Sequence, residues 1–369
     1  MKTLIQFVAF IMSFSASFSA TQVFGIGLET ANIKTSIPCI EKERESNGKH
    51  MVNERPVVPL NEYVGQTKVV AFLKEQIKGA QALASPLRHC LLLGNPGLGK
   101  TAMARSIAHA MGTKLSEVSG RKQLTPYLLS EMAKAFQPMD ILFIDEIHSV
   151  SHELQIFLQR LMTEQIVPVF ERTAISGKIK EVGETKVAPI TLIGATDRPG
   201  LLLKALYSRF GSPLILLPYA FEDMKIIVRQ LACRIGLTLT DEAHNILAGT
   251  SKGLPRVSEQ YLDDLKAFAA ANQIVDLTAD RVRESLRSQG LDQLGLNELD
   301  RTYLKHLAQV GEVGAKLNTL ASILSIDAFY LQRQIEPMLQ HIGFLHIDGR
   351  RFITVKGITY LEGGEHEKV

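Results

Sequence analysis

Several features that would narrow the function of this chain are missing from its sequence. Cysteine is scarce: there are three in 369 residues, at positions 39, 90 and 233, and no C-x-x-C pair. That pattern gives neither the ligand spacing of a zinc site nor a disulfide framework, and a reducing compartment is its simplest interpretation. Internal repeats and low-complexity tracts are also missing, so no repeat architecture is indicated.

An excess of charge of one sign is missing too. The formal net charge is +3, which is close to neutral for 369 residues and neither requires nor excludes a nucleic-acid partner. An apolar content of 46% with 21% charged residues is typical of globular proteins. The length predicts two or three domains.

Four short apolar runs between residues 88 and 220 have the length of strands. They are HCLLLG, DILFIDE, ITLIGAT and PLILLPY, and their lack of polar alternation is typical of buried parallel strands. Helical patterns separate the first three, in TAMARSIAHAMG, TPYLLSEMAKAF and SHELQIFLQRLMTE. Alternating strands and helices predict a doubly wound α/β fold, a parallel sheet with flanking helices.

The rest of the chain has a different pattern. From about Phe221 to Gly290 it is helical throughout. From about Leu291, short helical segments lead to GFLHIDGRRFITVKGITYL, where two β-rich runs flank an Asp-Gly turn and predict a hairpin. Helices followed by a terminal hairpin are the outline of a winged helix. We therefore predict a leader or linker over 1–50, an α/β domain over 51–219, a small helical domain over 220–290 and a winged-helix domain over 291–369.

A glycine-rich loop follows the first apolar run. The segment GNPGLGKT, residues 94–101, fits the pattern G-x-x-x-x-G-K-[ST]. Glycines let backbone N–H groups point inward around a polyphosphate, and the next helix presents its positive N-terminus. Lys100 is expected to reach the β- and γ-phosphates and Thr101 to supply a hydroxyl to Mg²⁺. A plain glycine turn needs neither side chain, so we predict a site for ATP or a related triphosphate.

A second apolar run supports this prediction. In MDILFIDEIH the strand pattern ends in Asp145 and Glu146. Asp145 is expected to hold Mg²⁺ through water, and Glu146 to polarise the attacking water as general base. Two acids at the end of a strand are often only solvated, but together with the glycine loop they make the second half of a nucleotide site.

The first residues do not fit an ATP-dependent enzyme. MKTLIQFVAFIMSFSASFSA has the shape of a secretory signal peptide and is too short and Ser-rich for a clear membrane span. An enzyme that consumes ATP is expected in the cytoplasm. Two explanations stay open: an over-extended start, with the coherent sequence beginning at Met51, or a leader that directs the chain to an organelle.

Six segments occur in a fixed order: NEYVGQ, GNPGLGKT, DILFIDEIH, TLIGATDRPG, SRFG and GLPRV. Together they resemble the RuvB family, AAA+ motors that drive branch migration of Holliday junctions. The resemblance covers about residues 54–362. It implies an AAA+ ATPase domain, a small helical lid domain and a C-terminal winged-helix head, assembled as a homo-hexamer on duplex or Holliday-junction DNA.

The resemblance also implies roles for particular residues. Arg209 in SRFG matches an arginine finger, which acts on the ATP of the neighbouring subunit and is worth on the order of 10³–10⁵ in rate. Arg256 in GLPRV matches a lid arginine that couples nucleotide state to domain angle. The residues expected to contact nucleotide are Arg55, Tyr63, Gly97, Leu98, Gly99, Lys100, Thr101, Ala102, Tyr219 and Arg256.

Some positions depart from the family pattern near the phosphates. Asp197 follows IGAT where the family carries threonine, at a position that contacts the region of the attacking water. An ionised Asp accepts hydrogen bonds only and repels a γ-phosphate, although it could also orient the water, so we expect slower or retuned hydrolysis. Ala102 replaces a second threonine after Thr101, which is a milder change.

Two surfaces that would contact macromolecules also differ. Residues 164–189 occupy the place of the hairpin that docks the partner RuvA; their alternation allows two strands, but the family sequence is not kept, so a RuvA-like adaptor is doubtful. The expected wing keeps Arg350 and Arg351 as DNA contacts but has Ile347 and Asp348 where basic residues are expected. Residues 291–369 hold eight Lys and Arg against ten Asp and Glu, about −2 in all, which predicts weak DNA binding by one subunit.

Three hypotheses therefore stand. The first, which we favour, is an ATP-driven DNA motor of the RuvB type. The second is an AAA+ assembly or remodelling ATPase that does not translocate on DNA, suggested by Asp197, the altered hairpin and the acidic head. The third is a paralogue that binds nucleotide but barely hydrolyses it.

Overall fold

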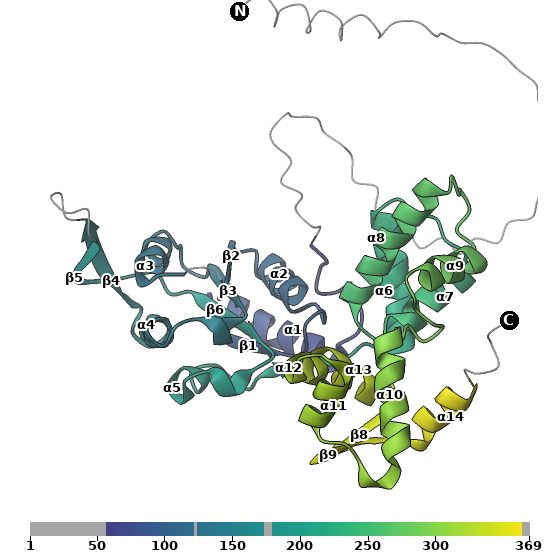
Figure 1. Ribbon diagram of the computed structural model, residues 1–369. Coiled ribbons are helices and arrows are strands. Elements are labelled where there is room, and N and C mark those ends of the chain that lie inside the picture. The colour runs from purple at the N-terminus through teal and green to yellow at the C-terminus, as the bar shows by residue number, and fades with distance from the viewer. Residues whose placement is uncertain (1–56, 122–123, 173–178, 364–369) are drawn as a thin grey trace, which may run out of the picture. The chain divides into compact units, whose positions relative to one another are not determined.

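The computed structural model describes residues 57–121, 124–172 and 179–363. Its largest sheet has five strands in the order β2-β3-β6-β1-β7, and every pair of neighbours is parallel. All five carboxyl ends therefore meet at one edge of the sheet (Figure 1). The strands are β1 (Cys90–Leu93), β2 (Leu115–Ser119), β3 (Ile141–Asp145), β6 (Thr191–Thr196) and β7 (Leu214–Ile215).

The four apolar runs became strands, as predicted, whereas β2 was not predicted. The sequence of β2 is LSEVS, and none of its residues is fully buried. An edge strand has a neighbour on one side only, so it can carry polar residues that remove the apolar signal.

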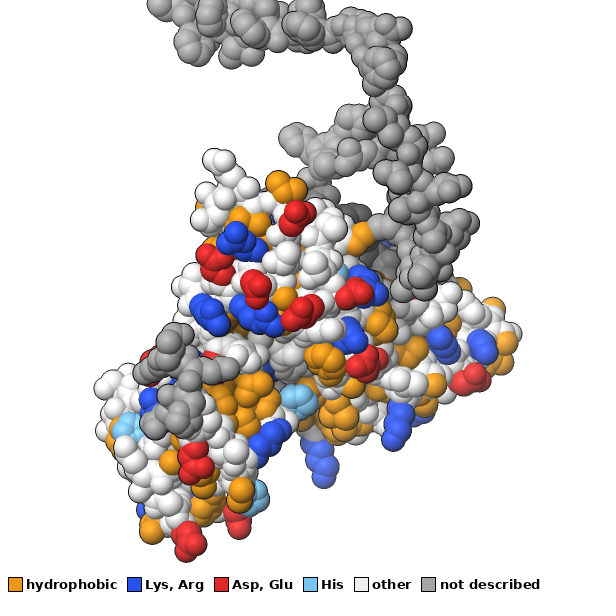
Figure 2. Space-filling view, turned by 90° about the vertical axis from the view of Figure 1, so that its right-hand side faces the viewer, with side chains coloured by type: hydrophobic (Ala, Val, Ile, Leu, Met, Phe, Trp, Pro, Cys, Tyr) orange, Lys and Arg blue, Asp and Glu red, His pale blue; other side chains and the backbone are white. Residues whose placement is uncertain are grey.

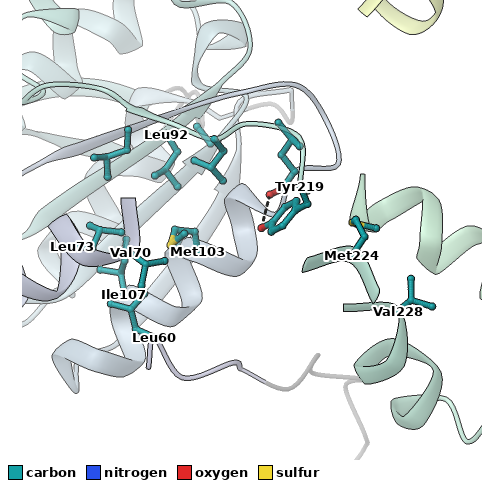
Figure 3. Close-up of a cluster of buried hydrophobic side chains, with 14 of the residues drawn as sticks. Leu60, Val70, Leu73, Leu92, Met103, Ile107, Tyr219, Met224 and Val228 are labelled. Atoms are coloured by element: carbon teal, nitrogen blue, oxygen red, sulfur yellow. Dashed lines mark hydrogen bonds between the residues drawn. The ribbon is translucent and has the colours of Figure 1, made fainter. Parts of the chain in front are cut away.

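Helices cover both faces of this sheet. Leu91 and Leu92 are adjacent in β1 but belong to different apolar clusters, because successive side chains of a strand point to opposite faces. Figure 3 shows one cluster, in which Val70 and Leu73 lie close to Met103 and Ile107. The doubly wound architecture is confirmed. The helical elements of this region are α1 (Thr67–Ala82), α2 (Lys100–Met111), α3 (Pro126–Lys134), η1 (Ile147–Ser149), α4 (His152–Glu164), η2 (Pro199–Leu201) and α5 (Lys204–Tyr207).

The predicted strand pair within residues 164–189 is present as a separate antiparallel hairpin. It consists of β4 (Ile166–Arg172) and β5 (Ile179–Lys186), which form a two-stranded sheet of their own. Ile179 and Val182 on β5 are each 50% exposed. The hairpin therefore presents apolar side chains to its surroundings as well as charged ones.

The region after the sheet is helical, as predicted. Its helices are α6 (Phe221–Arg234), α7 (Asp241–Thr250), α8 (Pro255–Ala271) and α9 (Ala279–Ser288). Met224 and Val228 of α6 are fully buried in the same apolar cluster as Leu92 and Tyr219 (Figure 3). The helix that follows the last strand of the sheet therefore packs its buried side chains into the same apolar core as the sheet.

The C-terminal region has an apolar core of its own, centred on Leu304, Leu320 and Leu339. The predicted hairpin is formed by β8 and β9 around the Asp-Gly turn, but the end of that segment is helical because residues 355–363 form α14. The elements are α10 (Glu298–Val310), η3 (Gly311–Val313), α11 (Leu317–Leu324), α12 (Ala328–Tyr330), the π-helical turn η4 (Leu331–Ile335), α13 (Glu336–His341), β8 (Leu345–Asp348), β9 (Arg350–Ile353) and α14 (Val355–Gly363).

Two further expectations concern cysteines and membranes. Cys90 in β1 is a free, buried thiol. Cys233 in α6 is disulfide-bonded, which the spacing of the cysteines did not indicate. Within the described ranges, no helix is both long and apolar enough to cross a membrane.

Candidate nucleotide-binding site

The glycine loop lies at the carboxyl edge of the sheet, between β1 and α2. Gly94, Gly97 and Gly99 have φ angles of 154°, 87° and 87°, which L residues with a side chain rarely adopt. A Cβ atom on Gly94 would lie 2.8 Å from the carbonyl oxygen of Leu216, so this glycine is also required by close packing. The loop leads into the N-terminus of α2, where unpaired backbone N–H groups and the helix dipole favour an anion.

Lys100 is the first residue of α2 and turns back over the loop. Its Nζ donates hydrogen bonds to the carbonyl oxygens of Gly94, at 2.8 Å, and Asn95, at 3.0 Å. Burial lowers the pKa of Lys100, while the charges of Asp145, Asp197 and Glu146 oppose that shift. The ammonium group therefore lies at the predicted phosphate cradle with three carboxylates in electrostatic range.

Asp145 ends β3 beside the loop, as predicted. Its Oδ1 accepts a hydrogen bond of 2.9 Å from the backbone N–H of Glu146. In the described part of the chain, no three His, Cys, Asp or Glu side chains form a group that could hold a metal ion. Mg²⁺ in nucleotide sites is held by one or two protein oxygens together with substrate phosphates and water, and Thr101 and Asp145 suit that arrangement.

Glu146 adopts a left-handed conformation, with φ of 51°, immediately after β3. Its carboxylate forms an ion pair with Arg121, which follows β2. Gly120 precedes Arg121, and a Cβ added to it would overlap the backbone carbonyl oxygen of Glu146. The close approach of the β2 and β3 ends thus brings a cation to the predicted general base.

The end of β6 carries a further polar cluster. Thr196 Oγ1 lies 2.8 Å from Nδ1 of His148, and it accepts a hydrogen bond of 2.9 Å from the backbone N–H of Arg198. Asp197 Oδ1 is 3.7 Å from His148 Nδ1, and Asp197 Oδ2 is 2.8 Å from Nη1 of Arg333. Burial lowers the pKa of His148, which favours its neutral form near pH 7.

Two tyrosines meet beneath the loop. The hydroxyl of Tyr63 is 3.3 Å from that of Tyr219 and 3.4 Å from the carbonyl oxygen of Gly99. The hydroxyl of Tyr219 lies 3.4 Å from the carbonyl oxygen of Leu98, which is itself buried. Burial raises the pKa of both tyrosines, so both are neutral hydrogen-bonding groups. Arg55, predicted to act with Tyr63, lies outside the described residues.

Arg256, at the start of α8, also reaches the loop. Its backbone N–H donates to the carbonyl oxygen of Gly97 at 3.4 Å. A Cβ atom added to Gly97 would lie 3.1 Å from the Cβ atom of Arg256. The neighbouring turn contacts Tyr219, whose N–H donates to the carbonyl oxygen of Gly253 at 2.9 Å. Both contacts connect the helical region to the predicted phosphate cradle.

Arg209 lies apart from this cluster. It follows α5, is exposed, and makes no side-chain hydrogen bond or ion pair with any residue that the structure describes. Its backbone N–H donates a hydrogen bond to the carbonyl oxygen of Leu206, which holds the backbone of Arg209 in place at the end of α5. Ala102 is also exposed, on the first turn of α2.

The two wing arginines have different surroundings. Arg350 is exposed and donates from Nη1 to the carbonyl oxygens of Val313 and Gly314. Arg351 is 9% exposed and forms an ion pair with Glu336, with its Nε 2.9 Å from Oε1. Tyr303 donates to the same carboxylate at 3.0 Å. The expectation that Arg351 is a surface contact for DNA therefore does not fit its position, because its guanidinium is used inside the domain.

The distribution of charge on the surface is a separate observation. Figure 2 shows one face of the molecule, on which Lys and Arg side chains are interspersed with Asp and Glu. On that face there is no continuous basic surface of the kind that dominates non-specific DNA binding.

Three side chains at the site were missed in the sequence. His148 is the last residue of the segment DILFIDEIH, so its position two residues after the acid pair could have predicted that it lies at the site. Arg121 and Arg333 gave no local signal, because they reach Glu146 and Asp197 from other elements. Arg333 is 136 positions from Asp197 along the chain.

A parallel sheet with a glycine loop and lysine after β1, an acid pair after β3 and a separate winged-helix region defines an AAA+ P-loop ATPase. The model of the Holliday junction DNA helicase RuvB P-loop domain matches residues 55–216, and that of the RuvB C-terminal winged helix domain matches residues 293–362. The chain belongs to the RuvB family.

Individual relatives agree with this assignment. The Holliday junction branch migration complex subunit RuvB of Kosmotoga olearia is 33% identical over 306 residues, covering 82% of this chain and 88% of the relative. The same subunit of Ehrlichia ruminantium is 31% identical over 332 residues, covering 89% and 97%. The solved structure of the Thermotoga maritima RuvB Holliday junction branch migration motor has a TM-score of 0.69 at 30% identity, covering 82% and 97%.

Proposed function

We propose that this chain is an ATP-driven DNA motor that drives branch migration of Holliday junctions in recombination and repair. The observation that carries the proposal is the carboxyl edge of the sheet, where Lys100 over its glycine cradle faces Asp145 and Glu146. The domains we assign to it are an ATPase domain over 51–219, a lid over 220–290 and a head over 291–369. Both internal boundaries fall outside helices and strands.

We assign the following roles to the residues of the proposed phosphate site. Backbone N–H groups of the loop and the ammonium of Lys100 bind the β- and γ-phosphates of ATP. Thr101 and Asp145 would hold Mg²⁺, which supplies charge neutralisation of the phosphates. Glu146 takes the proton of the attacking water, and for this its carboxylate has to leave Arg121.

Contacts to the rest of the nucleotide come from the loop and the elements beneath it. We assign Arg55, Tyr63 and Tyr219 to the region around the base, with Leu98 and Ala102 lining the path from the phosphates. Arg256 starts the lid helix α8 beside Gly97. Loss of the γ-phosphate on hydrolysis would therefore move the lid relative to the loop.

The reaction needs a second subunit. Arg209 is exposed and unpaired within the described part of the chain, which suits a guanidinium that acts on the ATP of a neighbour. We propose a homo-hexamer that works in the cytoplasm, where ATP is supplied.

DNA would be bound by the heads of several subunits together. One head has a net charge of about −2 and a single exposed wing arginine, Arg350, so one subunit binds weakly and a ring sums the contacts. The hairpin of β4 and β5 is the part of the chain that would contact an adaptor, but its sequence departs from the family, so we do not assign a RuvA-like partner to it.

A second function is favoured by the head itself. An acidic head with Arg351 buried is better suited to protein contacts than to a DNA backbone. In that case the chain is an AAA+ assembly or remodelling ATPase that does not translocate on DNA.

An ATPase assay on the full chain, with and without four-way junction DNA, tests the proposal. We expect hydrolysis that junction DNA stimulates and that Glu146→Gln abolishes, together with ATP-dependent separation of the junction arms. Glu153→Gln, at an exposed position on α4, is the matched control and should hydrolyse normally. Hydrolysis that ignores DNA under ring-forming conditions favours the remodelling function, and background hydrolysis in both the wild type and Glu146→Gln favours an inactive paralogue.

A further inference from the structure

Asp197 is a carboxylate at the edge of the phosphate site. It directly follows β6, and the backbone of the preceding residue contacts the glycine loop: the N–H of Gly94 donates to the carbonyl oxygen of Thr196 at 3.3 Å. The side chain of Asp197 is 15% exposed. Asp197 therefore brings a third negative charge, after Asp145 and Glu146, to the place where we propose that the γ-phosphate binds.

An unpaired acid at this point opposes the binding of ATP. Like charges that are close together in a partly buried site repel each other strongly, because solvent screens them poorly. The γ-phosphate adds negative charge that ADP lacks in this region. An unneutralised Asp197 would therefore weaken the binding of ATP more than the binding of ADP.

The structure pairs Asp197 with a cation from the C-terminal region. Nη1 of Arg333, in the π-helical turn η4, is 2.8 Å from Oδ2 of Asp197. The ring of Phe329 holds this guanidinium, because Cζ of Arg333 lies over the ring at 4.6 Å from its centroid, and Cζ of Arg198 lies over it at the same distance. A π-turn inside a helix often marks a functional position.

The other neighbours neutralise Asp197 less well. His148 is 3.7 Å away, but burial lowers its pKa, so it is neutral near pH 7. Arg198 approaches no closer than 4.0 Å. Arg333 is thus the one cation at hydrogen-bonding distance from Asp197 in the described part of the chain.

We propose that Arg333 is a positioning residue for ATP hydrolysis, which neutralises Asp197 and so makes the phosphate site compatible with a triphosphate. The inference rests on the proposed ATPase function. It assigns to the head a direct electrostatic role at the ATPase site, in addition to binding DNA. It also explains how the chain keeps an acid where an uncharged side chain is expected.

A double-mutant cycle on the full chain tests the proposal. Binding of ADP and of a non-hydrolysable ATP analogue is measured for the wild type, Arg333→Ala, Asp197→Asn and the double variant. We expect Arg333→Ala to weaken binding of the ATP analogue about tenfold and of ADP less than about twofold. Asp197→Asn should remove the need for Arg333, so the double variant should bind the ATP analogue within about twofold of the wild type.

Two further variants separate this role from a loss of structure. Arg333→Lys keeps the charge and should retain most of the affinity, and Lys305→Ala removes an exposed cation of the same region and should change nothing. Equal weakening of ADP and the ATP analogue by Arg333→Ala, or a double variant as weak as Arg333→Ala, would overturn the inference but leave the ATPase function standing. A wild type that binds neither nucleotide overturns both.

Discussion

The carboxylate of Glu146, the proposed general base, forms an ion pair with the guanidinium of Arg121. The pair joins the ends of two adjacent strands, because Arg121 follows β2 and Glu146 follows β3. A carboxylate that is paired with a cation is held in one direction and is not free to turn toward a water molecule. We therefore expect this pair to break before Glu146 can act on a water molecule.

Arg121→Ala should raise the turnover of ATP. The Arg121 side chain is 68% exposed, so the pair is screened, and we expect kcat at saturating ATP to rise about two- to fivefold. Steady-state phosphate release measures this. Lys134→Ala, which breaks a surface pair with Glu131 in the same domain, is the control and should leave kcat unchanged. A lower kcat in Arg121→Ala would mean that Arg121 holds the base in its working position.

Arg209→Ala should lower kcat by about 10³-fold while the binding of ATP changes little, because the proposed finger acts on a neighbour's phosphate. Mixing Arg209→Ala with Lys100→Ala subunits creates some interfaces with an intact finger and an intact cradle. Such mixtures should regain measurable activity, although each variant alone has almost none. Lys204→Ala, at an exposed position on α5, controls for surface charge. Full activity of Arg209→Ala as a monomer would contradict the assignment.

Much of the fold was predictable because burial leaves a local signal. The runs that became β1, β3 and β6 lie inside the sheet, where apolar residues are needed on both faces, and the glycine loop is a contiguous motif. β2 was missed because an edge strand can carry Ser and Glu. The helical ending of residues 355–363 was missed because β-branched residues there resemble a strand.

The site was predictable only where its residues are close in sequence. Lys100 and Thr101 share one motif, and Asp145 and Glu146 share another. The partners that set the charge of this site come from distant segments: Arg121 reaches Glu146, and Arg333 reaches Asp197. No local pattern marks such partners, since the residues next to an arginine in the sequence do not show whether its side chain is solvated or paired.

Replacing Arg351 should lower the stability of the protein, whereas replacing Arg350 should weaken its binding to DNA. Arg351→Ala leaves the buried carboxylate of Glu336 without its cation, and removing one partner of a buried pair costs about 3–5 kcal/mol in the free energy of unfolding. Denaturant unfolding of the full chain measures the loss. The double variant Arg351→Met with Glu336→Leu should recover most of it. An Arg351→Ala protein as stable as the wild type would show that the pair contributes little.

Arg350→Ala should leave that stability unchanged and weaken DNA binding instead. Arg350 is exposed, and its loss removes one phosphate contact, so the slope of log affinity against log salt should fall by about 1 for each engaged subunit. Retention of duplex DNA over a range of salt concentrations measures the slope. An identical slope in Arg350→Ala and the wild type would argue for a head that does not contact DNA.

Protonation of His89 should lower the stability of the protein in mild acid. Its Nδ1 accepts a hydrogen bond of 3.0 Å from the N–H of Leu192, and its Nε2 lies 3.3 Å from the carbonyl oxygen of Met162. The ring is therefore neutral, with its proton on Nε2, and burial lowers its pKa below the ordinary value.

The sign of the pH dependence follows from that direction. Above about pH 6.5 the ring is neutral in both the folded and unfolded chain, so its full contribution is present. As the pH falls below that value, the unfolded chain takes up a proton first, and stability drops until the folded pKa is reached. His89→Gln keeps a donor and an acceptor without titrating, so its melting temperature should fall less between about pH 7 and pH 5 than that of the wild type. Parallel melting curves for the two proteins across this range would contradict a role for His89.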